Sequence, residues 1–396
     1  MPSIVLFDNF ATRQNLLPLT FTKPIAHLRC GIFSNAERWQ KTNGAYKLSY
    51  ISTDYLIPLF PTVTEGSHVF VNGAAICSQA LRQQIIDLKP GEKLLLGENI
   101  VAANCSLGEF NSSSFSNFTT HNAKEDSCII INNPWDLFAK NDAAIRLDFA
   151  DLDQSKSQSL NNTMGVIGNN IFVEEGFEGN YSIINTKTGP VYLGKDSKIL
   201  EGAVIRGPFA LNNNAVVKMS AKIYGATTVG PHSKVGGEIN NSVITGYSNK
   251  GHDGFLGNAV IGEWCNLGAD TNNSNLKNNY DEVKLWSYEK QSFTKTGLQF
   301  CGLIMGDHSK CGINTMFNTG TVVGVSANIF GAGFPRNYIP SFTWGGTAGF
   351  STYKADKALA TMQRVMSRRA VDVTDNYTLM MNTIFENTSK YRNWEK

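Results

Sequence analysis

The sequence predicts a mixed α/β domain, a hexapeptide parallel β-helix and two C-terminal helices, in that order. The chain has 396 residues, more than one ordinary domain, and 42% of them are apolar, which is enough for a sizeable core. Through the middle of the chain an aliphatic residue recurs every six positions. Beyond residue 352 glycine is absent, and apolar residues recur at helical spacing.

The first 150 residues alternate strand-like apolar runs with segments of helical character. SIVLF and HVFV have the length of buried strands, and SQALRQQIIDL carries apolar residues at helical spacing. We therefore expect an α/β domain at residues 1–150, the coil at residues 151–350 and the terminal helices at residues 351–396.

The period of six is clearest from Val191, where the chain divides into VYLGKD, SKILEG, AVIRGP, FALNNN, AVVKMS, AKIYGA, TTVGPH and SKVGGE. At 42% apolar composition, eight apolar residues in a row at the third place arise by chance with a probability of about 0.001 per phase. Small residues mostly stand two places earlier. Each six is expected to form one flat face of a triangular coil, with the aliphatic side chain inside. The third places are Leu193, Ile199, Ile205, Leu211, Val217, Ile223, Val229 and Val235.

The period slips by two residues between Gly236 and Val243. The polar segment from about Asn272 to Leu298 breaks it, and we expect this segment to leave the coil as a loop or hairpin, an insertion of the kind that often lies on a binding face. Around that segment the interior positions are predicted to be Phe255, Ile261, Leu267, Met305, Cys311, Phe317, Val323 and Ile329.

Two helices are predicted at the C-terminus, with Thr374 or Asp375 as the cap between them. We expect them to seal the open end of the coil or to pack on a neighbouring subunit. Their apolar positions are Leu359, Met362 and Met366 in the first helix, and Leu379, Thr383 and Ile384 in the second.

Charge and cysteine content narrow the possible partners and compartment. With 35 Lys and Arg against 33 Asp and Glu, and no block of like charge, neither nucleic acid nor an anionic membrane is indicated, and a small-molecule ligand is favoured. Seven cysteines without paired CxxC spacing favour buried thiols over a disulfide framework, and no metal site is predicted. The start MPSIVLFDNF lacks a basic n-region and a long apolar core, so a cytoplasmic location is expected.

His252 lies in the stretch GHDGFLGNAVIGEWCNLGAD, which is followed by NNSNLKNNYDEVK. These segments resemble the acetyltransferase domain of the bifunctional glucosamine-1-phosphate acetyltransferase / N-acetylglucosamine-1-phosphate uridyltransferase family. The whole chain is similar to the variant found in Bacteroidetes and archaea. In that variant a reduced, Rossmann-like nucleotidyltransferase domain, with a motif like LLPLTFTKPIAHLRCGI here, precedes a left-handed β-helix. The likeness covers nearly all of the chain and is strongest from Gly236 to Pro340.

The resemblance implies an N-acetyltransferase that uses acetyl-CoA and an amino-sugar 1-phosphate. His252 matches the general base that takes a proton from the 2-amino group of the sugar. Asn266 matches a substrate-binding asparagine, and Asn275 matches one that holds the amine or the catalytic histidine. Residue type alone favours a surface or structural histidine, and only the matching neighbours of His252 favour a catalytic one. The asparagines could equally lie in turns or form an inward-facing ladder.

The family's other substrate and acetyl-CoA contacts fall on matching or altered residues. Cations for the sugar phosphate are expected from Lys222, which replaces an arginine, and from Lys250, Lys277 or Lys284. Phe255 replaces a tyrosine that touches the sugar, and Asn240 replaces a phosphate-binding lysine, so the exact sugar is open. An acetyl-CoA groove between subunits of a homotrimer is expected past Asn314 and Gly331, with Arg336 either at a CoA phosphate or docking a helix.

The N-terminal motif matches sugar nucleotidyltransferases only in part. SIVLF, Arg13, the PLT element and Pro24 are present, but no glycine occurs before Gly31, where the family has a glycine-rich phosphate loop. Either Asp8, Arg13, Lys23 and Arg29 surround the phosphates of UTP or dTTP, with Mg²⁺ required, or the domain has lost the reaction. The alternatives to acetyl transfer are therefore a nucleotidyltransferase with a structural β-helix and a non-catalytic scaffold that binds a sugar nucleotide.

Overall fold

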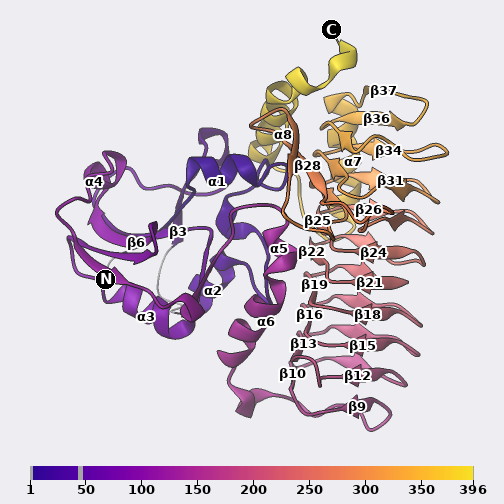
Figure 1. The fold of residues 1–396 in the computed structure, drawn as a ribbon, viewed down its shortest axis with the longest axis horizontal. Helices are drawn as coiled ribbons and strands as arrows, with labels where there is room; N and C mark the ends of the chain where they lie inside the picture. Colours follow the sequence, from indigo (N-terminus) through magenta and orange to yellow (C-terminus); the bar gives the residue numbers. More distant parts are fainter. Residues whose placement is uncertain (1–2, 43–47, 396) are drawn as a thin grey trace.

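A sheet domain, a long parallel coil and two terminal helices follow one another along the chain, as predicted (Figure 1). The computed structural model describes residues 3–42 and 48–395. Helix α6 ends at Ala150, the first coil strand begins at Gly165, and the first terminal helix begins at Ala355.

The sheet domain is built on six strands in the order β2-β1-β3-β6-β5-β7. Strand β1 runs parallel to β2 and β3, and β6 runs antiparallel to β3 and β5. The predicted runs SIVLF and HVFV form β1 and β3, and SQALRQQIIDL forms α3. The strands are β1 Ile4–Phe7, β2 Leu48–Ile51, β3 Ser67–Asn72, β5 Glu92–Leu96, β6 Asn99–Ser106 and β7 Thr119–Asn122, with a separate pair β4 Ala75–Cys77 and β8 Cys128–Ile130. The helices are α1 Phe10–Asn15, α2 Asn35–Thr42, α3 Gln79–Ile86, α4 Leu107–Asn111, α5 Asp136–Ala139 and α6 Asn141–Ala150.

The coil is a parallel β-helix of the left-handed type with three faces. Face 1 consists of β9 Gly165–Ile167, β12 Ile183–Asn185, β15 Val204–Arg206, β18 Lys222–Tyr224, β21 Glu238–Asn240 and β24 Phe255–Gly257, followed by β27 Asn272–Asn273 and β32 Met316–Phe317. Face 2 consists of β10 Ile171–Val173, β13 Val191–Leu193, β16 Phe209–Leu211, β19 Thr227–Val229, β22 Val243–Gly246, β25 Val260–Glu263, β30 Ile304–Met305, β33 Val322–Val323 and β35 Tyr338–Ile339. Face 3 consists of β11 Glu178–Gly179, β14 Lys198–Ile199, β17 Val216–Val217, β20 Lys234–Val235, β23 Asn249–Lys250, β26 Asn266–Leu267, β31 Lys310–Cys311, β34 Asn328–Ile329 and β36 Thr343–Gly346, with β37 Gly349–Thr352 antiparallel at its end.

The period of six places the interior residues as predicted, with one exception. All eight third-place residues from Leu193 to Val235 are at most 2% exposed, and Met305 to Ile329 continue the buried series. The prediction for Phe255 is wrong by one residue, because Leu256 points into the prism, in register with Ile239. Phe255 lies on the outer surface of face 1 and is half-buried.

The segment that interrupts the period forms a hairpin, as expected. Strands β28 Lys284–Ser287 and β29 Ser292–Lys295 pair antiparallel. The hairpin packs against the rest of the protein, and its residues Val283, Leu285 and Tyr288 are buried in the main hydrophobic core.

The sheet domain and the terminal helices cover face 2, and faces 1 and 3 point away from the sheet domain (Figure 1). One hydrophobic core joins residues of the sheet domain, of face 2 and of the terminal helices α7 Ala355–Ser367 and α8 Asp375–Asn387, including Leu6, Val260 and Ile384. Thr374 caps α8 by accepting a hydrogen bond from the Tyr377 N–H, as predicted. The expectation that the helices seal the end of the coil is wrong, because they pack beside face 2, and the β36–β37 hairpin lies at that end (Figure 1).

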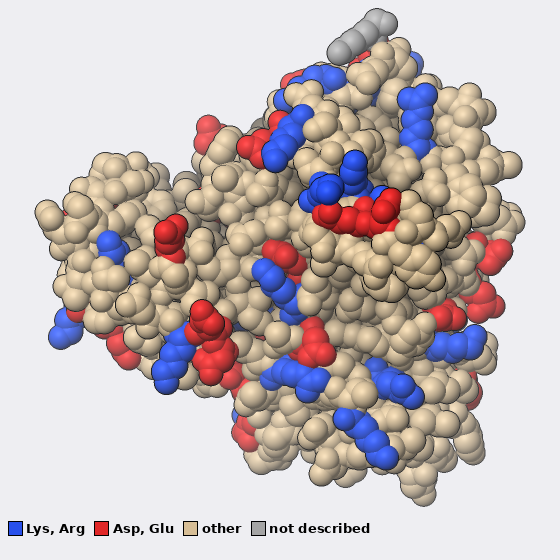
Figure 2. All heavy atoms as spheres, viewed as in Figure 1, with Lys and Arg blue, Asp and Glu red and all other residues tan. Residues whose placement is uncertain are grey.

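Charged side chains of both signs are interspersed over the face shown in Figure 2. Among the helices of residues 3–42 and 48–395, none combines the length and apolar character that crossing a bilayer requires.

Candidate active site

A shortened corner of the coil creates a cavity beside His252, which lies between β23 and β24, where the chain passes from face 3 to face 1. Six positions separate the interior residues Val217 and Ile223 across one such corner, but only four separate Val235 and Ile239 across the next. This is the slip of two seen in the sequence. The resulting cavity has a volume of about 500 Å³, and its lining includes Lys218, Met219, Gly236, Gly237, His252, Asp253 and Asp270.

Glycine is required at the shortened corner because the next coil closes directly over it. Gly237 has φ +75°, and a Cβ atom there would lie 2.7 Å from the carbonyl oxygen of Gly254 and 2.9 Å from that of His252. The His252 loop therefore depends on the two glycines below it for its position.

Lys250 supports the same loop from inside the coil. It occupies the interior position of β23, in register with Val235, and is 2% exposed. Its Nζ donates to the carbonyl oxygens of His252 at 2.6 Å and Asp253 at 3.0 Å. Burial lowers the pKa of Lys250 to about 8, against the opposing effect of the nearby Asp253 carboxylate. The predicted role of Lys250 as a phosphate ligand is therefore wrong, because the ammonium group faces the interior.

A second cavity of about 480 Å³ continues along the same corner of the coil. Asp270 borders both cavities, and Asn314 and Gly331, two predicted acetyl-CoA contacts, line the second one. Ala332 and Gly333 leave the backbone there open to close approach. The structure thus brings His252, Asn314 and Gly331 onto one edge of the coil.

Four other predicted site residues lie at the sides of this corner. Lys222 and Phe255 are the first residues of their strands on face 1, and the register aligns both with Glu238. Asn240 lies at the far side of the same face. Asn266 lies on face 3, where its Oδ1 accepts a hydrogen bond from Asn249 at 3.0 Å.

Asn275, Lys277 and Arg336 lie away from His252 within the same chain. The Nδ2 of Asn275 donates to the Oδ1 of Asn258 at 2.8 Å, at the corner that follows β24, whereas His252 precedes that strand. Lys277 and Arg336 line a different cavity, between the hairpin and the end of the coil. The prediction that they share the site of His252 is not met within one chain.

Sequence reasoning missed Asp253, Asp270 and Lys218, which line the His252 cavity. The sequence signal that could have located them is the slip of two residues in the period at Gly236 and Gly237. The corner there is two residues shorter than its neighbours, so side chains of the adjoining corners are exposed beside it.

In the sheet domain, Asp8 and Arg13 are paired with each other. The Oδ2 of Asp8 lies 2.8 Å from the Nη1 of Arg13, and its Oδ1 accepts from the Ile25 N–H at 2.9 Å. Burial raises the pKa of Asp8, and Arg13 opposes this shift. Because both oxygens are engaged, Asp8 does not fit the role of a magnesium ligand. Among the described residues, no group of three or more His, Cys, Asp or Glu side chains is arranged to hold a metal ion.

Lys23 and Arg29 connect the sheet domain to the coil. Lys23 Nζ lies 2.9 Å from carboxylate oxygens of both Glu263 and Asp307. Burial acts to lower the pKa of Lys23, but the two carboxylates raise it above its ordinary value. Arg29 donates to the carbonyl oxygen of Thr245 at 3.2 Å. The predicted phosphate-binding role of these two cations is therefore wrong, because other groups of the chain already engage them.

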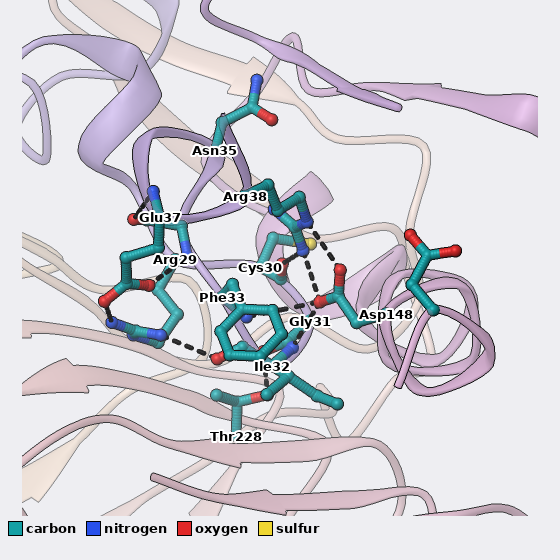
Figure 3. A network of polar contacts seen from close by, with 12 residues as sticks. Arg29, Cys30, Gly31, Ile32, Phe33, Asn35, Glu37, Arg38, Asp148 and Thr228 are labelled. Carbon is teal, nitrogen blue, oxygen red and sulfur yellow. Dashed lines mark hydrogen bonds and ion pairs between the residues drawn. The ribbon is translucent and has the colours of Figure 1, made fainter. Parts of the chain in front are cut away.

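The RCGI part of the N-terminal motif lies within the same junction (Figure 3). Arg38 donates to both oxygens of Asp148 at 2.6 Å, and Asp148 accepts the Ile32 N–H at 2.7 Å. From the coil, the Thr228 hydroxyl donates to the carbonyl oxygen of Gly31 at 2.9 Å. This loop thus holds the sheet domain against face 2.

Known proteins are similar to parts of this chain. Residues 4–157 match the family model described as sugar nucleotidyl transferase. The uncharacterized acetyltransferase YaiX of Escherichia coli O6:K15:H31 (strain 536 / UPEC) is 26% identical over 164 residues, 41% of this chain and 70% of the relative. The bifunctional sugar-1-phosphate nucleotidylyltransferase/acetyltransferase of Sulfurisphaera tokodaii is 29% identical over 144 residues, 36% of this chain and 35% of the relative.

Among solved structures, UDP-N-acetylglucosamine acyltransferase from Campylobacter jejuni aligns with 57% of this chain and 96% of its own at 13% identity and a TM-score of 0.33. The match to the bifunctional relative spans only 35% of that protein's length. The chain is similar to the bifunctional sugar-1-phosphate nucleotidylyltransferase/acetyltransferases, and its residues 4–157 are similar to sugar nucleotidyl transferases.

Proposed function

We propose that the protein is an N-acetyltransferase that moves the acetyl group of acetyl-CoA to the 2-amino group of a glucosamine-1-phosphate-like sugar. The observation that carries this proposal is the position of His252. It lines a cavity that continues along the coil into a second cavity bordered by Asn314 and Gly331. The acetyltransferase names of the relatives support the same reaction. We place the reaction in the cytoplasm.

In the proposed reaction, the amine nitrogen of the sugar bonds to the carbonyl carbon of the thioester, and the C–S bond breaks. His252 accepts the proton that the amine loses and passes it to the departing thiolate, so that N-acetyl sugar and free CoA result. The imidazole is exposed and forms no hydrogen bond with any residue that the structure describes, so it is available to a substrate. Lys250 fixes the backbone of the loop that carries it.

The active site is proposed to combine residues from two chains of a homotrimer. Within one chain Asn275 lies at the opposite end of β24 from His252, so we expect it to contribute to the cavity of a neighbour. Faces 1 and 3 are free for association, since the sheet domain covers face 2. Large apolar side chains are exposed on face 1 and on the adjoining corner, among them Ile183, Val204, Met219, Ile313 and Met316.

The test is release of CoA thiol from acetyl-CoA in the presence of glucosamine-1-phosphate. The wild type is expected to turn over. The kcat of His252→Asn is expected to be at least about a hundredfold lower, which is the usual contribution of a general base to the rate. His121→Asn, which changes a histidine of the sheet domain, serves as the matched control and should retain full activity. Turnover by His252→Asn at the wild-type rate would refute the assignment.

The shared site has its own test. Chains with His252→Asn and chains with Asn275→Ala are each expected to be nearly inactive alone. When the two are unfolded and refolded together, mixed trimers contain one intact site and should recover activity. Absence of recovery, with mixed trimers confirmed by mass spectrometry, would place Asn275 outside the site.

Nucleotidyl transfer by residues 4–157 is the second candidate function. The family match and a cavity of about 490 Å³ beside Asp8, Arg13 and Asp54 favour it. The enzyme would then also join a sugar 1-phosphate to UTP or dTTP with release of pyrophosphate. Because this cavity shares no lining residue with the cavity beside His252, pyrophosphate release is expected to survive His252→Asn unchanged. If neither activity is found, a sugar-nucleotide-binding scaffold is the remaining alternative.

A further inference from the structure

A large cavity of about 890 Å³ lies apart from the proposed acetyl-transfer site. The β28–β29 hairpin, the last coil at β35, strand β37 and the C-terminal turns at residues 389–395 enclose it. It shares no lining residue with the cavities beside His252. Its volume is in the range that holds a ligand of nucleotide size.

Cations line this cavity without matching carboxylates. Lys277, Lys284, Arg336 and Lys390 contribute to the wall, and no Asp or Glu within residues 3–42 and 48–395 does. The side chains of Lys284, Arg336 and Lys390 form no ion pair or hydrogen bond with the described part of the chain. An anion inside the cavity would therefore meet several uncompensated positive charges.

The hairpin register adds to the positive charge. Lys284 stands directly opposite Lys295 in the antiparallel pair. Like charges at directly opposed positions destabilise a strand pair. Glu282, at 3.5 Å, is the one carboxylate in the described part of the chain that forms an ion pair with Lys295. A bound anion at Lys284 would remove this repulsion.

Aromatic rings form much of the remaining wall. Trp286 stacks on Tyr338 with ring centroids 4.1 Å apart and an angle of 11° between the planes. Phe293 is 44% exposed, and Phe350 and Trp394 meet edge to face at 5.6 Å. Such surfaces bind planar heterocycles by stacking, largely without regard to which base is present.

We propose that this cavity binds a nucleoside phosphate, with the base against the aromatic wall and the phosphates at Lys284, Arg336 and Lys390. A sugar phosphate would use the cations but not the rings, and an apolar ligand would use the rings but leave the cations unpaired. Two sources carry this chemistry: a free nucleotide or nucleotide sugar, and the nucleotide end of CoA.

The test is isothermal titration calorimetry of the full-length protein with UDP, ADP, CoA, uridine and inorganic phosphate. UDP or ADP is expected to bind at least about tenfold more tightly than uridine or phosphate alone, because each of these carries only half of the recognition. No heat from any nucleotide at millimolar concentration would overturn the proposal.

Substitutions locate the site. The double variant Lys284→Ala/Arg336→Ala is expected to lose at least about tenfold in nucleotide affinity, since each lost charge-assisted contact has an effect of that order. Phe293→Ala, at an exposed ring, is expected to weaken nucleotides but not phosphate. Lys290→Ala removes an exposed cation from the same hairpin that does not line the cavity, and should bind like the wild type. Equal affinity of the double variant and the Lys290→Ala control would refute the site.

The same titrations separate the two sources and the two proposals. Binding of UDP or ADP as tight as that of CoA identifies a free nucleotide as the ligand, and much tighter binding of CoA, lost in the double variant, identifies its nucleotide end. In His252→Asn, nucleotide binding should be unchanged while acetyl transfer is lost. Failure of acetyl transfer in the wild type would leave the nucleotide titration unaffected.

Discussion

The Nζ atom of Lys250 lies 2.6 Å from the carbonyl oxygen of His252 and reaches it from inside the coil. The proposed general base is thus held by a lysine that substrate does not contact. Lys250→Met keeps the length of the side chain but leaves the carbonyl oxygens of His252 and Asp253 without their donor. We expect kcat to fall by at least about tenfold, as for a lost hydrogen bond to a charged group, with the KM for acetyl-CoA within about twofold of wild type. Steady-state kinetics of acetyl transfer measure both constants. An unchanged kcat would mean that the His252 loop keeps its geometry without Lys250.

Lys250 should also make stability depend on alkaline pH. The pKa of Lys250 is about 8 in the folded protein and has the ordinary lysine value of 10.5 in the unfolded chain. Between these pH values the unfolded chain therefore binds more protons than the folded protein. The free energy of unfolding is therefore expected to rise as pH increases from about 8 to 10.5. Urea denaturation at several pH values measures this slope, and Lys250→Met should reduce it by the contribution of one proton.

Gly237→Ala should displace the His252 loop. The added Cβ would meet backbone atoms of Gly254 and His252 in addition to the strain of φ +75°. We expect the free energy of unfolding to fall by about 2–4 kcal/mol. The rate of acetyl transfer per folded molecule should fall as well, because the His252 loop is displaced. Gly91→Ala is the matched control, because Gly91 has φ +81° but nothing within 4 Å of the added atom. It should cost only about 1 kcal/mol, and equal costs for the two variants would show that crowding at Gly237 is absent.

The half-buried His27 and the buried His308 should destabilise the protein in acid. Burial, aided by Lys23, lowers the pKa of His27 to about 4, and burial, aided by Lys310, lowers that of His308 to about 3. Both are neutral in the fold but protonated in the unfolded chain below about pH 6.5, so stability falls as pH decreases from 6.5 toward 4. At pH 5 unfolding should take up about two protons from this pair. His308→Gln, measured by denaturation between pH 5 and 7, should lower that uptake by about one.

The ion pairs of Lys23 should control docking of the sheet domain. Lys23→Met leaves the buried carboxylate of Asp307 without its cation, and we expect a loss of about 3–5 kcal/mol. Lys198→Met removes the exposed pair with Glu178 and should cost less than about 1 kcal/mol. Because one core joins both parts, calorimetry of the wild type should show a single transition. Separate melting of the two parts would contradict the shared core.

The regular part of the coil could be predicted from sequence because one side chain in six must fill the prism. Leu193 and its seven successors satisfy this rule, whereas Phe255 and Leu256 are adjacent apolar residues that the period alone does not distinguish after a slip. His252 could be identified from its neighbours, but the interior position of Lys250 could not, because lysine normally marks a surface.

The roles of the N-terminal cations could not be predicted from the sequence. Arg13, Lys23 and Arg29 lie in a segment that resembles a phosphate-binding motif. Only the fold shows that other groups of the chain already engage them, namely Asp8, Glu263, Asp307 and the carbonyl oxygen of Thr245. The separation of Asn275 from His252 likewise depends on which corner of the coil each residue occupies, which the spacing in the chain does not reveal.

The shortened corner at Gly236 and Gly237 also bears on how such a site can arise. In a regular coil the corners on one edge project about equally far from the axis. Removing two residues draws one corner inward, so that the adjoining corners overhang it and a hollow forms beside His252. In genetic terms, the loss of two codons in frame converts part of a repeat array from a plain rod into a surface with a pocket, without any added loop or domain.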